Sequence, residues 1–187
     1  MLAYLFWHSP APGTEQADYE ALLAAFHESL AASQIEGLAC SAAFLVRGLT
    51  WLGAGAPSYE DWYLLEDFAA LGRLNEAAVT GRRTSPHDAV AARAGTGTAG
   101  VYAHRGVAVP SPRGDVAVWF SRTPGSSYDE VFARAPSEGE LWQRQMTLGP
   151  TPELCLLRER PLEVGDDLLA GVPTVVVRER TIVALGG

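Results

Sequence analysis

Lysine is absent from this chain of 187 residues, so all 14 of its basic side chains are arginines. The absence excludes Schiff-base catalysis and a Walker-type phosphate loop, because both need a lysine amine. Acidic residues outnumber basic ones and give a net charge of −8. Because a surface of this charge repels phosphates, we expect no nucleic acid as a partner.

Cysteine is almost as scarce, with only Cys40 and Cys155 in the sequence. Two cysteines are too few for a disulfide scaffold, so we expect both to be reduced, structural residues in a cytoplasmic protein. No apolar run is long enough to span a bilayer, and the apolar stretch at 2–7 lacks the basic flank of a signal peptide. We therefore expect no membrane partner.

Hydrophobic residues make up 48% of the chain, which is ample material for a core. In the first half, alternating and helical apolar spacings follow the order strand, helix, strand, strand, helix, strand, which is typical of a ferredoxin-like unit. The helix after the third strand is capped by Asp67, and a further helix restarts at Ser85 and Pro86. The predicted strands are 2–8, 38–47, 61–66 and 101–107, and the first two predicted helices begin near 18 and 68.

The second half repeats this order in a shorter form. Capping boxes predict helices that start at Ser127 and at Ser137, the latter helix carrying residues 141–146. The predicted strands are 116–121, 154–158, 175–179 and 181–185. We therefore predict an α+β fold of two ferredoxin-like halves, 1–108 and 115–187, that share one core. Their antiparallel sheets face each other and form an α+β barrel with the helices outside.

One glycine-rich stretch matches the spacing of a dinucleotide-binding motif but not its structural context. Residues 95–100 fit G-x-G-x-x-G, and Asp115 lies 20 residues after Gly95. The dinucleotide fingerprint needs a strand before the glycines and a helix after them, whereas here we predict the reverse order. We interpret the stretch as a helix-to-strand loop.

Metal and acid–base motifs are also sparse. The four histidines show no spacing such as H-E-x-x-H, so we expect no metal site and no other cofactor. Four carboxylates bracket the third strand, and solvated strand ends plus a helix cap account for them. They are Glu60, Asp61, Glu66 and Asp67.

Strand alternation places aromatic and histidine side chains together. Tyr4, Phe6 and His8 share one face of the first strand, and Tyr102 and His104 share one face of the fourth. We predict that they line an apolar pocket inside the barrel, with simple core filling as the alternative. Of these residues, Tyr4, Phe6, Tyr102 and His104 are the expected ligand contacts.

Three candidate catalytic residues accompany this pocket. His8 or His27 would transfer a proton, since histidine titrates near neutral pH. Arg122 occupies the position that matches His8 in the repeat, and it would hold an anionic oxygen.

One family pattern fits part of the chain. A Pro12-Gly13 turn followed by a helix with Tyr19, Phe26 and His27 resembles the first helix of EthD-like proteins of the dimeric α+β barrel superfamily. Residues 62–71 resemble that family's third strand and second helix, and 120–125 repeat the turn, so the chain looks like a tandem repeat. The second half departs from the pattern, because Pro136 stands where the helix histidine would fall.

The resemblance implies several activities: cofactor-independent monooxygenases, polyketide cyclases, haem enzymes and proteins without known activity. We predict a protein that binds a small apolar or aromatic molecule, and our first hypothesis is a monooxygenase- or cyclase-like enzyme that acts on it without a bound metal. A non-catalytic binding or sequestering protein is one alternative. A haem protein with His27, His8 or His104 as axial ligand is another. The sequence does not decide whether the protein forms a homodimer.

Overall fold

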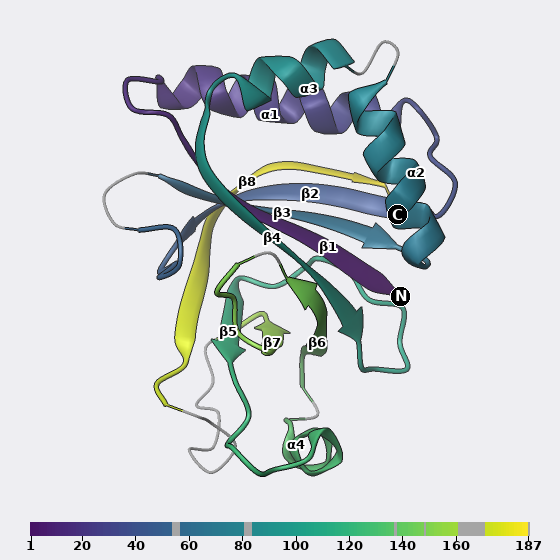
Figure 1. The fold of residues 1–187 in the computed structure, drawn as a ribbon, viewed down its shortest axis with the longest axis vertical. Helices are drawn as coiled ribbons and strands as arrows, with labels where there is room; N and C mark the ends of the chain where they lie inside the picture. The colour runs from purple at the N-terminus through teal and green to yellow at the C-terminus, as the bar shows by residue number, and fades with distance from the viewer. Residues whose placement is uncertain (54–56, 81–83, 137, 148, 161–170, 187) are drawn as a thin grey trace.

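The computed structural model describes residues 1–186 except 54–56, 81–83, 137, 148 and 161–170. Helices and strands follow one another along this part of the chain as shown in Figure 1. The elements are β1 (Leu2–Pro10), α1 (Gln16–Ala31), β2 (Leu38–Arg47), β3 (Ser58–Leu65), α2 (Phe68–Val79), α3 (Thr84–Ala91), β4 (Ala94–His104), β5 (Val116–Phe120), α4 (Tyr128–Arg134), β6 (Glu140–Thr147), β7 (Leu154–Arg158) and β8 (Thr174–Gly186).

The strands close into a barrel in the order β1-β3-β2-β8-β5-β7-β6-β4. Strands of the first half follow the order β4-β1-β3-β2, and those of the second follow the equivalent order β8-β5-β7-β6. The halves join where β2 pairs with β8 and β4 pairs with β6, both antiparallel. Helices α1, α2 and α3 lie outside the first sheet, and α4 lies at the far end of the second (Figure 1). The predicted α+β barrel of two ferredoxin-like sheets is confirmed.

Three packed cores hold this architecture together. Inside the barrel, Trp7 and Trp62 of the first half pack with Trp119 and Trp142 of the second. A separate core joins α1, α2 and α3 to the outer face of the first sheet. A smaller one joins α4 to the outer face of the second sheet. Both faces of the first sheet are therefore buried.

Two helix ends are capped as predicted. The Asp67 carboxylate accepts a hydrogen bond from the Ala70 backbone N–H at 2.8 Å, at the first turn of α2. Ser127 and Glu130 form the predicted capping box of α4. Ser85 and Pro86 lie in the first turn of α3. No helix among the described residues is long and apolar enough to cross a membrane.

Two segments that the sequence predicts as a helix and a loop are strands in the structure. Residues 140–147 form strand β6 rather than a helix, because Leu141 packs under α4 while Trp142 points into the barrel. The capping residue predicted for that helix, Ser137, lies outside the described residues. The glycine-rich stretch 95–100 belongs to β4 and pairs with β1 instead of forming a loop. A side chain at position 97 would collide with the Phe6 ring, so the ring can occupy this position only because residue 97 is glycine.

Candidate active site

A cavity of about 640 Å³ lies between the outer face of the first sheet and helices α1, α2 and α3. Most of its wall is apolar, with leucines, alanines and valines supplied by the three helices. One part of the wall is polar and comes from β1, β3 and α1. The polar and aromatic lining residues are Tyr4, Phe6, His8, Tyr19, Phe26, Asp61, Tyr63, Phe68, Asn75 and His87.

Asp61 is the centre of a buried polar cluster at this wall. Its Oδ1 lies 3.2 Å from His8 Nε2, and its Oδ2 lies 3.6 Å from His27 Nε2. Tyr63 donates its hydroxyl to Oδ2 at 3.2 Å. His8 and His27 are buried, and Asp61 is only 2% exposed. Interpreting Asp61 as a solvated strand end is therefore wrong, as it is for Glu60, which is 0% exposed.

Strand pairing and helix packing bring this cluster together. Phe6 of β1 lies opposite Asp61 of β3, and His8 lies opposite Tyr59, so His8 and Asp61 are diagonal neighbours on one face. Helix α1 packs on that face and places His27 in a stacked contact with Tyr63, with ring centroids 5.1 Å apart. Side chains from three separate elements thus surround one carboxylate.

The second nitrogen of His8 is also engaged. Tyr19 of α1 places its hydroxyl 2.7 Å from His8 Nδ1. His8 Nε2 approaches Asp61 closely but off the hydrogen-bond direction, so this contact is an electrostatic pair rather than an aligned hydrogen bond. A carboxylate beside Nε2 favours a proton on that nitrogen, which leaves Nδ1 to accept the Tyr19 O–H.

Burial and charge set the protonation of these groups. Burial alone would raise the pKa of Asp61, but the neighbouring His8 and His27 outweigh it and hold this pKa below its ordinary value. Burial, reinforced by the Asp61 charge, raises the pKa values of Tyr4, Tyr19 and Tyr63. The cluster at neutral pH is therefore a buried carboxylate surrounded by neutral phenols.

A metal site needs several ligating side chains close together. Among the described residues, no group of three or more His, Cys, Asp and Glu residues is arranged to hold a metal ion. The histidines of the cluster instead approach opposite oxygens of Asp61. An axial-ligand role for His8, His27 or His104 stays a prediction.

The structure separates the residues that the sequence grouped. Tyr4, Phe6 and His8 share one face as predicted, but this face is outside the barrel, against the helices, so the predicted interior location is wrong. Both faces of the first sheet are buried, and alternation alone does not say which one faces the interior.

Tyr102 and His104 lie on the other side of the sheet. The Tyr102 ring packs with Trp7 and Trp119 inside the barrel, and His104 contacts Trp142. For Tyr102, which is fully buried, core filling describes the position. These residues are not brought together with His8.

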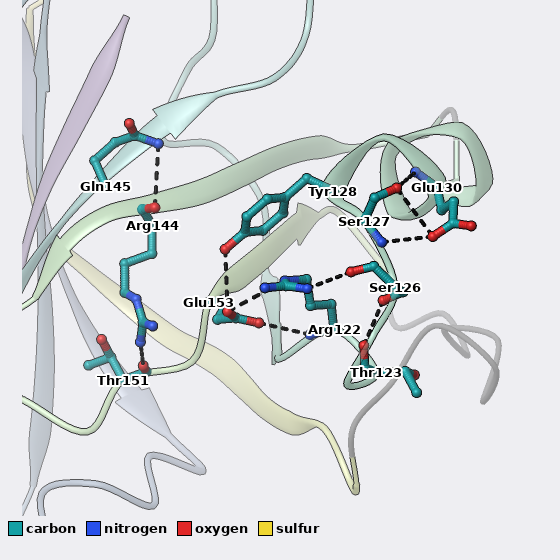
Figure 2. Close-up of polar contacts among 10 residues, drawn as sticks. All are labelled: Arg122, Thr123, Ser126, Ser127, Tyr128, Glu130, Arg144, Gln145, Thr151 and Glu153. Carbon is teal, nitrogen blue, oxygen red and sulfur yellow. Dashed lines mark hydrogen bonds and ion pairs between the residues drawn. The ribbon is translucent and has the colours of Figure 1, made fainter.

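Arg122 belongs to a different cluster, shown in Figure 2. Its guanidinium lies over the Tyr128 ring at 4.7 Å, and its Nε is 3.7 Å from Glu153. Its backbone N–H donates to Glu153, and its Nη1 donates to the Ser126 carbonyl. Arg122 therefore ties α4 to the second sheet, and the predicted pairing of Arg122 with His8 at one pocket does not occur.

Sequence reasoning missed three members of the buried cluster, Asp61, Tyr63 and Tyr19. A usable signal was present, since Tyr59, Asp61 and Tyr63 alternate along β3 and so share a face. An acid between two tyrosines on a strand face indicates a polar pocket more than a solvated end.

Comparison with known proteins supports the fold. No family model and no curated protein matches the sequence. An anthrone oxidase-like protein of known structure is 12% identical, with a TM-score of 0.54, and the match covers 96% of this chain and 92% of that one. A "putative monooxygenase" from Fusobacterium nucleatum subsp. nucleatum is 9% identical, with a TM-score of 0.58 and coverage of 96% and 93%. At these identities the likeness shows the fold alone: the chain shares the α+β barrel of these two proteins, and its EthD-like assignment stays a prediction.

Proposed function

We propose that this protein is an oxygenase that uses dioxygen to oxidise an enolisable or phenolic polycyclic molecule such as anthrone. One observation carries the proposal. An acid–base cluster of His8, Asp61 and Tyr19 forms the polar wall of an otherwise apolar cavity. Such a cavity suits an aromatic ligand oriented by a few polar groups.

Proton removal is the first step. The ligand places an enol or phenol hydroxyl against Tyr19, which passes its own proton to His8 Nδ1 as it takes the proton of the ligand. Asp61 stabilises the imidazolium that forms, through the 3.2 Å approach to Nε2. The raised pKa of Tyr19 suits this role, because a neutral phenol can donate and accept in the same step.

Dioxygen is the oxidant of the second stage. The ligand anion gives one electron to dioxygen, and the two radicals combine to form a carbon–oxygen bond. The resulting peroxide anion takes the proton back from His8. Loss of the remaining proton from the same carbon then breaks the O–O bond and releases water. For anthrone, the balance is anthrone plus dioxygen to anthraquinone plus water.

The names of the two structural neighbours agree with this chemistry, since one is anthrone oxidase-like and the other is called a monooxygenase. A cyclase would use the same base without dioxygen, so oxygen dependence separates the two activities.

A non-catalytic binding protein is the second candidate. It is favoured by the surroundings of His8, whose Nδ1 lies 2.7 Å from the Tyr19 hydroxyl and whose Nε2 lies 3.2 Å from Asp61, because such a cluster can also serve as buried polar packing alone. This candidate predicts ligand binding without turnover.

The test is dioxygen uptake by the purified protein with anthrone, followed together with quinone absorbance. We expect equal amounts of dioxygen consumed and anthraquinone formed, above the rate without protein. His8→Gln should lower the rate by about 100-fold, within the usual range for loss of a general base. His104→Gln, a histidine outside the cavity, is the matched control and should retain the rate. Binding of anthrone with no dioxygen uptake would reject the oxygenase and support the binding protein.

A further inference from the structure

We propose that Glu60, which lies inside the barrel, is a positioning residue for the His8–Asp61 pair on the opposite face of the sheet. Glu60 does not line the cavity and acts through Trp7 and Trp62. The inference rests on the proposed role of His8 as a proton acceptor, and the experiment below tests the two separately.

Glu60 holds the two tryptophans from opposite oxygens. Trp7 Nε1 donates to Oε2 at 2.9 Å, and Trp62 Nε1 donates to Oε1 at 2.6 Å. The carboxylate and both indoles are fully buried. Hydrogen bonds to a buried charge are stronger and more directional than those between neutral groups. The two rings are therefore fixed relative to one another.

These tryptophans are the chain neighbours of the site residues. Trp7 directly precedes His8 on β1, and Trp62 directly follows Asp61 on β3. Since successive side chains of a strand point to opposite faces, the hydrogen bonds of Glu60 lie directly behind the His8–Asp61 contact. Trp7 and Glu60 are opposite each other in the ladder that joins the two strands. A change in their separation inside the barrel would change the separation of His8 and Asp61 outside it.

The second half of the chain completes this interior cluster. Arg178 of β8 places Nη2 3.1 Å from Glu60 Oε1 and lies over the Phe44 ring at 3.9 Å. Its Nη1 donates to the carbonyls of Pro112 and Gly114, in the connection between the halves. Both members of the ion pair are buried. The second half thus anchors the carboxylate that spaces the two strands of the site.

Stability alone is a weak reason for this arrangement. Desolvation of two buried charges often cancels their attraction, and apolar side chains of similar size stabilise a core at least as well. The better-attested use of a buried charged or polar group is to specify one register among several. Here the register that matters joins β1 to β3, the strands that carry His8 and Asp61.

The test compares three tryptophan-to-phenylalanine variants. They differ in whether the indole N–H that is lost donates a hydrogen bond to Glu60. Trp7→Phe and Trp62→Phe each remove one hydrogen bond to Glu60. Trp119→Phe is the matched control, because Trp119 is equally buried in the same core and its N–H has no partner among the described residues. The probe is 2-hydroxyanthraquinone, whose phenolate absorbs at longer wavelength than its phenol. Its central ring is already a quinone with no C–H to oxidise, so we expect no turnover.

The measured quantity is the phenolate fraction of the bound probe as a function of pH. His8→Gln, which tests the proposed function, should lower that fraction about tenfold at neutral pH. Trp7→Phe and Trp62→Phe should lower it about threefold, while Trp119→Phe leaves it at the wild-type value even if its melting temperature falls. If Trp7→Phe or Trp62→Phe does not fold, Arg178→Lys replaces it, with the same expected fall.

Two outcomes overturn different claims. If His8→Gln leaves the phenolate fraction unchanged, His8 is not the proton acceptor, and both the proposed function and this inference fall. If His8→Gln lowers the fraction but all three phenylalanine variants behave alike, only the positioning role of Glu60 falls. A structural role alone would lower the melting temperatures and leave the pH titration of the probe in place.

Discussion

The two halves of the barrel share a strand order but differ in what covers their outer faces. The first sheet is covered by α1, of 16 residues, together with α2 and α3, and a cavity of about 640 Å³ remains beneath them. The second sheet is packed by α4, of seven residues, over a small core. His8 lies near the end of β1 and Arg122 follows the equivalent strand β5, yet His8 faces a cavity and Arg122 is held by Tyr128 and Glu153. A repeated backbone therefore does not repeat a site, because the helices above the sheet decide whether space remains.

Separating the halves should have the largest effect. Residues 1–108 alone would expose the interior face that carries Trp7 and Trp62, which the second half covers. We expect this fragment to show no cooperative thermal transition, whereas the full chain unfolds in one step. Circular dichroism and calorimetry check this. A monomeric, cooperatively folding fragment would show that the first half is an independent domain.

The next largest difference between the halves should appear when the central carboxylate of each cluster is removed. Asp61→Asn removes the negative charge that His8, His27 and Tyr63 contact in their buried positions. It should lower the free energy of unfolding by about 3 kcal/mol. Glu153→Gln, at the less buried cluster of Arg122, should cost about 1 kcal/mol or less. Urea denaturation measures both values. Equal losses would contradict a special role for the first-half cluster.

The pH dependence of the Asp61→Asn effect gives a sharper version of that comparison. The folded pKa of Asp61 lies below its unfolded value, so its stabilising contribution is complete above the ordinary aspartate pKa of about 4. This contribution is lost as the pH falls through the folded value. The stability difference between wild type and Asp61→Asn should therefore be constant near neutral pH and shrink in acid. A difference that grows in acid would contradict the direction of the shift.

Removing one hydroxyl from each half should have a smaller effect. Tyr19→Phe removes the partner of His8 Nδ1, and Tyr128→Phe removes a hydroxyl that donates to Glu153 at 3.3 Å. Each should cost about 1 kcal/mol of stability. Only Tyr19→Phe should also slow anthrone oxidation, by about tenfold or more, because only Tyr19 relays the proton. Similar oxidation rates for the two variants would remove Tyr19 from the relay.

The smallest expected difference between the halves is in the reactivity of their single cysteines. Cys155 is fully buried and Cys40 is partly exposed. Burial raises the pKa of both thiols, which further lowers their reactivity. We expect slow labelling of Cys40 by a bulky maleimide and none of Cys155 until the protein unfolds, as followed by mass spectrometry. Fast labelling of Cys155 would mean that the barrel interior opens.

Local chemistry made part of the fold predictable. The junction between β3 and α2 depends on Asp67 and its immediate neighbours, and the capping box of α4 depends on Ser127 and Glu130. Strand β6 was missed because its role is non-local: it joins β4 to β7 and thereby closes the barrel. Capping-box spacing before a run with Leu141 and Trp142 favours a helix when only neighbours are considered.

The site was only partly predictable for a similar reason. Alternation correctly placed Tyr4, Phe6 and His8 on one face, but the buried environment of that face depends on α1. The charge of Asp61 favours a solvated position when the sequence is considered alone, whereas in the structure His8 and His27 approach its two oxygens. A buried carboxylate is defined by its partners, and these come from β1 and from α1.

We propose that ligands bind at His8, outside the barrel, and not in the interior near His104. Nuclear magnetic resonance of protein labelled with ¹⁵N at its four histidines tests it most directly. Titration with 2-hydroxyanthraquinone should shift the ring-nitrogen signals of His8 strongly and those of His27 less, with His104 unchanged. A shift confined to His104, or none at any histidine, would contradict the account.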